Sequence, residues 1–408
     1  MKLNTKCRVC GSANLIKFFD LGDQPYANSL LKGFDEKENL YPLSLSRCAD
    51  CSLVQLDHTA EPEELFSQYV WVTGTSEGAQ KHAENFYKKL VERSVSQGRG
   101  YVLEVASNDG VFLRPFLNNG FEVLGVDPAE NIVDIALNNG VLTECAFFGK
   151  NYAKDLVGRR GRAKIVFARN VLPHVAGTRD FVGGLATVLD DAGVLAVEVH
   201  YAGVILDELH YDSIYHEHLC YFTFKTLERL LNDFKLFVFD IEKSPISGGS
   251  IIVYAKKKSA EERFPVKNYR EEEARSGKNE LESWQGFAER SFEHREKLLS
   301  MINDVLSSGK TLIGYGASAR SSTMLNFCKI NANLISVIAD KNPLKQGKFT
   351  AGTRIPITSP EEAMKKRPEY ILLLAWNFSD EIIKYLKKEF DYGGAFIVPL
   401  PSNPRILK

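Results

Sequence analysis

The sequence predicts an α/β protein with a small cysteine-rich N-terminal module and two doubly wound, Rossmann-like domains. Two Cys-x-x-Cys pairs lie near the N-terminus. A pattern of strand, turn, helix, strand and acidic residue begins at Tyr101, and a second one begins at Thr311. Because a chain of 408 residues is too long for one ordinary core, we expect two or three domains of about 100–200 residues each.

The composition is that of an ordinary globular protein. Hydrophobic residues make up 44% of the chain and charged residues 25%. The 51 basic and 52 acidic residues nearly cancel, which argues against broad binding to nucleic acid or to a membrane surface. No apolar run reaches the roughly 18–20 residues of a membrane span, and the N-terminus lacks the apolar core of a signal peptide. We therefore expect a cytoplasmic protein without nucleic-acid or membrane partners, with a monomer favoured.

The N-terminal module, residues 1–65, carries Cys7, Cys10, Cys48 and Cys51. Two thiolate pairs on short turns are the usual way to close a tetrahedral zinc shell. Since no export signal is present, a disulfide framework is not expected. A redox-active pair, or cysteines that are simply buried, is the alternative. Four sulfur ligands leave no open coordination position, so the expected zinc ion is structural.

Residues 66–258 are predicted to form the central domain. Segment 61–98 is expected to be mostly helical, with an irregular aromatic stretch that contains Tyr69 and Trp71. The simplest interpretation of these two aromatic residues is core packing between modules.

The first doubly wound pattern indicates a nucleotide-type cofactor. A strand from Tyr101 runs into a turn that ends at Gly110, and the next strand ends at Asp127. Asp127 follows Glu104 by 23 positions (127 − 104), close to the roughly 20 expected for a ribose-binding acid. The turn lacks the other fingerprint glycines, and a cofactor without a pyrophosphate does not need them. S-adenosylmethionine is such a cofactor; a domain of this class that binds no nucleotide is the alternative.

Groups suited to proton transfer follow later strands of the same domain. Asn170 and His174 come after the strand 163–168, at the sheet edge where ligands bind. Tyr215-His-Glu-His218 places four titratable side chains together, and histidine suits acid–base chemistry near neutral pH. A buried hydrogen-bonded cluster is the alternative, and metal binding is disfavoured because no further ligand is marked. In a straight strand Tyr215 and His218 would face opposite ways, so we expect a bend here.

The remaining chain is divided into a linker and a C-terminal domain. Residues 259–309 are rich in charge, with helical spacing from Leu298 to Leu306, and are predicted to form a helical linker on the surface. Residues 310–408 begin with Gly314-Tyr-Gly-Ala-Ser-Ala319, a Gly-x-Gly-x-x-Ala turn. This turn alone is a weak sign of a dinucleotide site; the alternative is a helix N-terminus that holds a substrate phosphate.

Taken together, the motifs resemble those of the three-domain nucleotide-sugar C-methyltransferases that act on keto-deoxysugars, over nearly the full length. The motifs that carry this resemblance are the two Cys-x-x-Cys pairs, Ala106-Ser-Asn-Asp-Gly110, Gly125-Val-Asp-Pro-Ala129, Phe147-Phe-Gly149, Asn170-Val-Leu-Pro-His174, Ile214-Tyr-His-Glu-His218, Gly248-Gly-Ser250, Gly314-Tyr-Gly-Ala317, Asn342-Pro-Leu-Lys-Gln-Gly347 and Ala375-Trp-Asn377. The resemblance implies a central S-adenosylmethionine-dependent methyltransferase domain of class I. It also implies a nucleotide-linked keto-sugar substrate between the modules, with its nucleotide diphosphate held partly by the N-terminal and C-terminal parts.

The resemblance also implies roles for particular residues. The expected catalytic residues are His218 as base, Tyr215 and His174 as donors to the keto oxygen, Glu217 to orient the sugar or a histidine, and Tyr69 over the reacting face. The expected cofactor-binding residues are Glu104, Ala106, Asn108, Gly110, Asp127, Pro128, Phe148 and Asn170.

Departures from the family pattern leave the sugar and the methylated carbon open. His200 lies in a segment that usually carries proline, Ser247 stands where many relatives have histidine, and Ser321-Ser322 replaces a common Gly-Asn. Methyl transfer to oxygen or nitrogen of a nucleotide sugar is the competing enzymatic interpretation. A non-catalytic zinc and nucleotide-binding module and an oxidoreductase that uses the C-terminal turn are the others.

Overall fold

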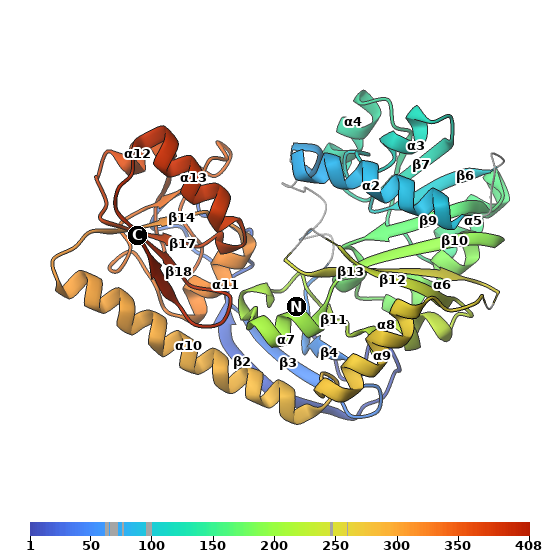
Figure 1. Cartoon of the computed structure of the whole chain (residues 1–408), viewed down its shortest axis with the longest axis horizontal. Coiled ribbons are helices and arrows are strands. Elements are labelled where there is room, and N and C mark those ends of the chain that lie inside the picture. The colour runs from blue at the N-terminus through green and yellow to red at the C-terminus, as the bar shows by residue number, and fades with distance from the viewer. Residues whose placement is uncertain (62–64, 66–71, 76, 95–99, 245–247, 259) are drawn as a thin grey trace.

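The computed structural model describes residues 1–61, 65, 72–75, 77–94, 100–244, 248–258 and 260–408. Two lobes stand apart, and each is built on a mostly parallel sheet (Figure 1). The N-terminal strands and one long helix run beneath both lobes and connect them. The α/β architecture and the order of its parts confirm the predicted fold class. Among the described residues, no helix has the length and apolarity that crossing a membrane requires.

The N-terminal part forms a four-stranded antiparallel sheet in the order β11-β4-β3-β2. Its strands are β2 (Leu15–Gln24), β3 (Tyr41–Cys48), β4 (Val54–Leu56) and β11 (Cys220–Tyr221). A separate short pair joins β1 (Lys2–Leu3) to β5 (His58–Thr59). Strand β11 comes from far along the chain, directly after His218, so the predicted catalytic stretch is anchored to the N-terminal sheet.

The central lobe is a seven-stranded sheet in the order β12-β13-β10-β9-β6-β7-β8, in which only β13 runs antiparallel to its neighbours. The strands are β6 (Tyr101–Val105), β7 (Glu122–Asp127), β8 (Thr143–Cys145), β9 (Ala163–Arg169), β10 (Leu189–His200), β12 (Phe237–Ser244) and β13 (Ser250–Lys256). Strands β12 and β13 pair antiparallel at one edge of this sheet.

Helices cover both faces of this sheet, as the continuous apolar strands require. They are α2 (Glu77–Arg93), α3 (Arg114–Asn118), α4 (Glu130–Asn138), α5 (Lys150–Arg160), α6 (Thr178–Val188), α7 (Ala202–Glu208) and α8 (Phe224–Asn232), with short 3-10 turns η1 (Thr73–Thr75), η2 (Leu172–His174) and η3 (Tyr211–Ser213). Val102 and Ile165 pack with Phe86 and Phe116 on one face, whereas Leu103 and Val166 belong to the core on the other. Leu117, the neighbour of Phe116 in α3, is exposed.

The C-terminal lobe is a six-stranded sheet in the order β16-β15-β14-β17-β18-β19, with only β19 antiparallel. Its strands are β14 (Leu312–Tyr315), β15 (Ile338–Ala339), β16 (Ile357–Thr358), β17 (Tyr370–Leu373), β18 (Ala395–Val398) and β19 (Arg405–Leu407). Its helices are α11 (Ala319–Phe327), α12 (Pro360–Met364), η4 (Trp376–Phe378) and α13 (Ser379–Phe390).

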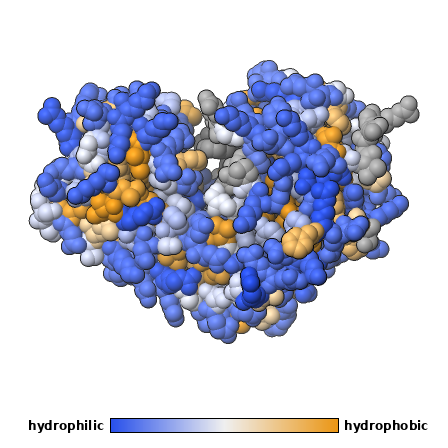
Figure 2. Space-filling view, viewed as in Figure 1, coloured by the Kyte–Doolittle hydropathy of each residue, from blue (hydrophilic) through white to orange (hydrophobic). Residues whose placement is uncertain are grey.

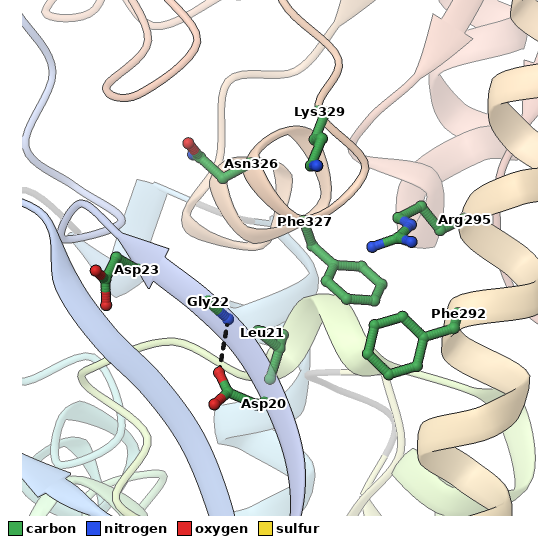
Figure 3. Close-up of a pocket in the computed structure, with 9 residues that line it drawn as sticks. All are labelled: Asp20, Leu21, Gly22, Asp23, Phe292, Arg295, Asn326, Phe327 and Lys329. Atoms are coloured by element: carbon green, nitrogen blue, oxygen red, sulfur yellow. Dashed lines mark hydrogen bonds between the residues drawn. The ribbon is translucent and has the colours of Figure 1, made fainter.

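Two helices link the lobes, α9 (Phe264–Ser276) and α10 (Leu281–Ser307). The predicted helix is present, but α10 is more than a solvated surface linker, because one face of it is buried against β2. Its Phe287 packs edge-to-face on Phe19, and Trp284 contacts Phe18. A pocket of about 330 Å³ opens where this helix meets β2 and the end of α11; Arg295 and Lys329 line it together with Asp20 and Asp23 (Figure 3).

Candidate active site

The turn after β6 has an irregular backbone that opens the carboxyl edge of the central sheet. Ala106, Asn108 and Gly110 adopt positive φ angles of 57°, 48° and 76°. Positive φ is uncommon for residues other than glycine, and such outliers gather at functional sites. At Gly110 a Cβ atom would also lie 2.8 Å from Val141. Asn170, which follows β9 at the same edge, has a φ of 49°.

Asp127 ties this turn to the end of β7. One carboxylate oxygen accepts a hydrogen bond from the Asn108 amide at 3.0 Å, and the other accepts one from the Ala129 amide at 3.0 Å. Burial raises the pKa of Asp127, although the two amides oppose that shift. A carboxylate oxygen has two lone pairs, so Asp127 retains the capacity to accept ribose hydroxyls. Pro128 lies between these anchored positions.

The residues around the turn fit an S-adenosylmethionine molecule. Glu104 is almost fully buried at the end of β6, and its Oε2 atom has no hydrogen-bond partner among the described residues. Burial, the main cause, raises the pKa of Glu104 well above its ordinary value. Gly125 lies behind the turn, where a Cβ atom would come within 2.4 Å of Ser107 Oγ. A buried acceptor and a turn free of side-chain bulk are what a bound adenosyl group would require.

A short segment before α2 docks on the same turn. The Thr73 amide donates to Asn108 Oδ1 at 2.8 Å, and the Gly74 amide donates to Asp109 Oδ2 at 2.9 Å. At position 74 a Cβ atom would lie 2.3 Å from that carboxylate oxygen, so the contact requires glycine. Residues 73 and 74 therefore lie directly against the cofactor turn. Tyr69 itself lies outside the described residues.

Phe148 is the expected cofactor residue whose surroundings are mainly those of a packing residue. Its ring contacts Phe181 and Tyr152, with centroids 5.5 and 5.9 Å away. These partners belong to α6 and α5, so the ring fills the junction of two helices. Phe147, its neighbour, is half-exposed.

The stretch Tyr215–His218 forms a tight turn, as the sequence argument predicted. The His218 amide donates to the Tyr215 carbonyl at 2.9 Å, which closes the turn. Leu219 then donates its amide to the Pro173 carbonyl at 2.7 Å. This bond joins the turn to η2, so that His174 and His218 meet with ring centroids 4.8 Å apart.

His218 and Tyr215 form a hydrogen-bonded pair with a defined direction. His218 Nδ1 lies 2.7 Å from the Ser213 carbonyl oxygen, which can only accept, so Nδ1 carries the proton. Nε2 then accepts from the Tyr215 hydroxyl at 2.8 Å. Burial lowers the pKa of His218 well below its usual value and that of His174 to about 4. Both imidazoles are therefore neutral near pH 7, with a basic lone pair on Nε2 of His218.

Glu217 and His216 connect the turn to the N-terminal part. Asn28 donates to Glu217 Oε1 at 2.7 Å, and burial raises the pKa of Glu217 to about 7. The buried His216 ring lies edge-on to Tyr26 and Tyr41, at 5.3 and 6.1 Å between centroids. Tyr215 and His218 thus contact each other, whereas His216 and Glu217 contact the N-terminal part.

The four predicted zinc ligands converge at one end of the N-terminal sheet. The sulfur atoms of Cys7, Cys10, Cys48 and Cys51 all lie within 4.8 Å of one another. Cys7 and Cys51 are 3.4 Å apart, and Cys10 and Cys48 are 3.6 Å apart. Sulfurs at 2.3 Å from a tetrahedral zinc ion lie about 3.8 Å apart, so the cluster fits Zn²⁺.

The glycines of the C-terminal Gly-x-Gly-x-x-Ala turn are explained by contacts within the protein. A Cβ atom on Gly316 would lie 2.6 Å from Ala375, and one on Gly314 would lie 2.9 Å from Ile338. Asp340 accepts from the Ala317 amide at 2.7 Å, and Lys345 donates to the Ala317 carbonyl at 2.8 Å. The fingerprint alone gives no reason to assign a dinucleotide here.

Several residues that contact the site escaped sequence reasoning. Asn28 contacts Glu217, and Gly74 contacts Asp109 of the cofactor turn. Arg320 contacts Asp212, which lies just before the turn Tyr215–His218. Only Gly74 carried a local signal, as a glycine that interrupts an aromatic helical stretch. The other contacts join residues more than 100 positions apart: Asn28 with Glu217, and Arg320 with Asp212.

A Rossmann-like sheet with an acid-anchored open turn, next to a buried acid–base cluster and a four-cysteine centre, defines a zinc-binding methyltransferase. Family models agree, matching a zinc binding domain at residues 7–66, a methyltransferase domain at 79–238 and a C-methyltransferase C-terminal domain at 245–401. The C-methyltransferase NovU of Streptomyces niveus is 35% identical over 406 residues, covering 98% of this chain and 96% of NovU. The chain belongs to this C-methyltransferase family, whose methyl donor is S-adenosylmethionine.

Solved methyltransferase structures match parts of the chain. They include the CcbJ methyltransferase of Streptomyces caelestis, 15% identical with a TM-score of 0.35, covering 49% of this chain and 97% of that chain. Magnesium protoporphyrin IX methyltransferase of Synechocystis is 16% identical with a TM-score of 0.34, covering 44% of this chain and 79% of that chain.

Replacing Asp127 with alanine is expected to weaken S-adenosylmethionine binding about 100-fold, because the turn loses its anchor and the ribose its acceptor, at about 1–3 kcal/mol for each unmade bond. Isothermal titration calorimetry measures the change. Asp134→Ala, at an exposed position of α4, is the matched control and should bind normally. Unchanged affinity in Asp127→Ala would remove Asp127 from the cofactor site.

Proposed function

We propose that the enzyme methylates a carbon beside the ketone of a nucleotide-diphosphate-linked keto-deoxysugar, after a base removes a proton from that carbon. The observation that carries this proposal is the neutral His218–Tyr215 pair, which lies against His174 after the carboxyl end of β9. Methyl transfer to an oxygen or nitrogen needs no carbon base, whereas methyl transfer to carbon does. The motif resemblance to nucleotide-sugar enzymes supports the substrate class.

Proton removal from carbon requires a base and a stabilised enolate oxygen. In the free enzyme the Tyr215 hydroxyl occupies the lone pair of His218 Nε2. A keto oxygen that accepts the Tyr215 hydroxyl would free that lone pair, and His174 stands beside it as a second donor. The C–H electrons then move onto the keto oxygen while the proton goes to His218 Nε2. Donors to such an oxyanion contribute roughly 3–4 kcal/mol each.

Carbon–carbon bond formation completes the reaction. S-adenosylmethionine supplies an electrophilic methyl group when bound at the Asp127 turn. The enolate carbon would take that methyl group as the ketone re-forms, and Tyr215 would keep its hydrogen bond to the oxygen. The electron pair of the broken methyl–sulfur bond would stay on sulfur, so that S-adenosylhomocysteine leaves. Glu217, held by Asn28, is assigned to orient the sugar, and Tyr69 is assigned to cover the reacting face. The proton on His218 leaves to solvent before the next turnover.

Two measurements test the proposal. A panel of nucleotide-linked keto-sugars is incubated with enzyme and methyl donor, and the products are analysed by mass spectrometry and NMR for a new C-methyl group. Separately, enzyme and substrate are held in D₂O, where deuterium should enter beside the ketone. An O- or N-methylated product, with no deuterium uptake, would refute base-catalysed C-methylation.

Glu217 is expected to make stability depend on pH. Its pKa of about 7 in the folded protein exceeds the ordinary 4.5, so folding favours the protonated carboxyl. The contribution is complete below pH 4.5 and is lost as pH rises through 7, to a total of about 3 kcal/mol. Urea unfolding of the wild type and Glu217→Gln at pH 5 and pH 8 measures it. The variant should lose less stability at pH 8, and parallel losses would contradict this prediction.

A further inference from the structure

Asp212, just upstream of the catalytic turn, is held by the C-terminal lobe. This carboxylate has no exposed surface. It accepts from Arg320 Nε at 3.1 Å, from Arg320 Nη2 at 2.8 Å and from Trp376 Nε1 at 2.7 Å. Arg320 lies in the first turn of α11 and Trp376 begins η4. Three donors in fixed directions on one buried carboxylate leave it little freedom to move.

A second bond fixes the backbone on the other side of Ser213. Thr323, one turn along α11 from Arg320, donates its hydroxyl to the Ile214 carbonyl at 2.8 Å. Thr323 is itself buried. Helix α11 therefore holds Asp212 by its side chain and Ile214 by its backbone, and Ser213 lies between these two anchors.

The carbonyl of Ser213 is the group that decides which nitrogen of His218 carries a proton. It accepts the Nδ1 proton at 2.7 Å, which leaves Nε2 as the basic atom facing Tyr215. A carbonyl rotated away would allow the other tautomer, whose Nε2 is protonated and cannot act as a base. The ring in that tautomer could no longer accept the Tyr215 hydroxyl at Nε2.

We propose that helix α11 and Trp376 set the tautomer of His218 through residues 212–214, and that Arg320, Thr323 and Trp376 are positioning residues for the catalytic base. The inference rests on the proposed function in one respect, namely that His218 is the base. It assigns the C-terminal lobe a role in the chemistry itself, in addition to any contact with the substrate. The carboxylate–arginine pair is suited to this task because its bidentate geometry fixes direction as well as distance.

The test compares variants that keep shape but remove one of these bonds. Thr323→Val loses the hydroxyl at nearly constant volume, and Thr323→Ser keeps it. Arg320→Lys replaces the bidentate fork with a single point charge. Thr187→Val is the matched control, because the Thr187 hydroxyl also donates to a backbone carbonyl, that of Gly183 in α6.

The primary readout is the ¹⁵N NMR spectrum of the histidine rings in full-length enzyme, with the His218 signals assigned by their loss in His218→Asn. In the wild type, Thr323→Ser and Thr187→Val, His218 should be the Nδ1-protonated form. In Thr323→Val and Arg320→Lys an Nε2-protonated population should appear. The turnover number should fall about 10–100-fold, with the Michaelis constant for the keto-sugar nearly unchanged, as is typical when a supporting hydrogen bond is lost.

An unchanged His218 tautomer in both Thr323→Val and Arg320→Lys would overturn the inference. The NMR readout needs no turnover, so its result is independent of the substrate. If the wild type methylated no keto-sugar while the tautomer still responded, the proposed function would fail and the positioning role would stand. A loss of turnover equal in Thr187→Val and Thr323→Val, with the tautomer unmoved, would also count against it.

Discussion

The His218→Ala enzyme is expected to transfer methyl groups about 10³-fold more slowly than the wild type, because a positioned general base contributes roughly 10²–10⁴-fold. Deuterium uptake beside the ketone should fall by a similar factor, since it reports the same proton removal without the second step. S-adenosylmethionine binding, measured by calorimetry, should stay within about twofold of the wild type. Among the described residues, His218 contacts Tyr215, Ser213 and His174, and none of these three belongs to the Asp127 turn.

Tyr215→Phe is expected to reduce the rate about 10²–10³-fold, as is typical when an oxyanion donor is removed. Tyr101→Phe is the matched control: Tyr101 is the first residue of β6, at the opposite edge of the central sheet, and its hydroxyl donates to the Gly161 carbonyl, so its loss should not affect turnover. Wild-type turnover in both His218→Ala and Tyr215→Phe would show that His218 is not the base and that Tyr215 is not the oxyanion donor. If Glu217→Gln abolished deuterium uptake while His218→Ala did not, Glu217, with its pKa of about 7, would be the base instead.

Local features of the candidate site could be predicted from the sequence because the residues proposed to form it lie in short segments. Asp127 ends a strand whose pattern is clear, and its distance from Glu104 is set by one strand–helix–strand unit. The bend at Tyr215–His218 was predicted from side-chain alternation together with the expectation that both side chains meet one substrate. In the same way, two Cys-x-x-Cys pairs were enough to predict a zinc site with four sulfur ligands, and the four sulfur atoms do lie together.

Contacts between distant segments were not accessible. Asn28 reaches Glu217 across 189 positions, and Arg320 reaches Asp212 across 108. Neither pair has a local signature, because an asparagine or an arginine on a loop or helix end is ordinary on its own. The same holds for β11, whose two residues pair with β4, as Cys220 with Gln55 and Tyr221 with Val54, across a long stretch of sequence. Packing of α10 on β2 was missed because charge dominates the helix sequence and conceals its apolar face.

These contacts join the N-terminal part to the turn Tyr215–His218, which we propose to be catalytic. The sheet β2–β4 carries the cysteine cluster at one end and pairs with β11, which follows the turn directly. Tyr41, the first residue of β3, contacts His216 together with Tyr26. The C-terminal lobe holds the other flank of the same turn through Asp212. A short irregular segment is thus fixed from both sides, which is how a turn with few bonds of its own can hold reactive groups accurately.

Removing the zinc ion is therefore expected to stop catalysis while leaving methyl-donor binding largely intact. Structural zinc sites contribute roughly 10–16 kcal/mol of binding free energy to their folded modules, more than the total stability of most domains. Without it, strands β2–β4 should loosen, and Glu217 should lose the contact with Asn28. The turnover number should then fall more than about 100-fold, whereas the Asp127 turn belongs to a separate sheet and should still bind S-adenosylmethionine.

Dialysis against a chelator, followed by turnover assays, calorimetry and hydrogen exchange, measures each part of this expectation. Exchange should rise in residues 1–60 and around 215–221 but not in β6, β7 or β9. Cys48→Ser should reproduce the effect, and Cys145→Ser, an exposed thiol outside the cluster, should not. A zinc-free enzyme with full turnover would mean that the N-terminal sheet does not support the catalytic turn, whereas loss of methyl-donor binding as well would mean that the support extends to the whole central lobe.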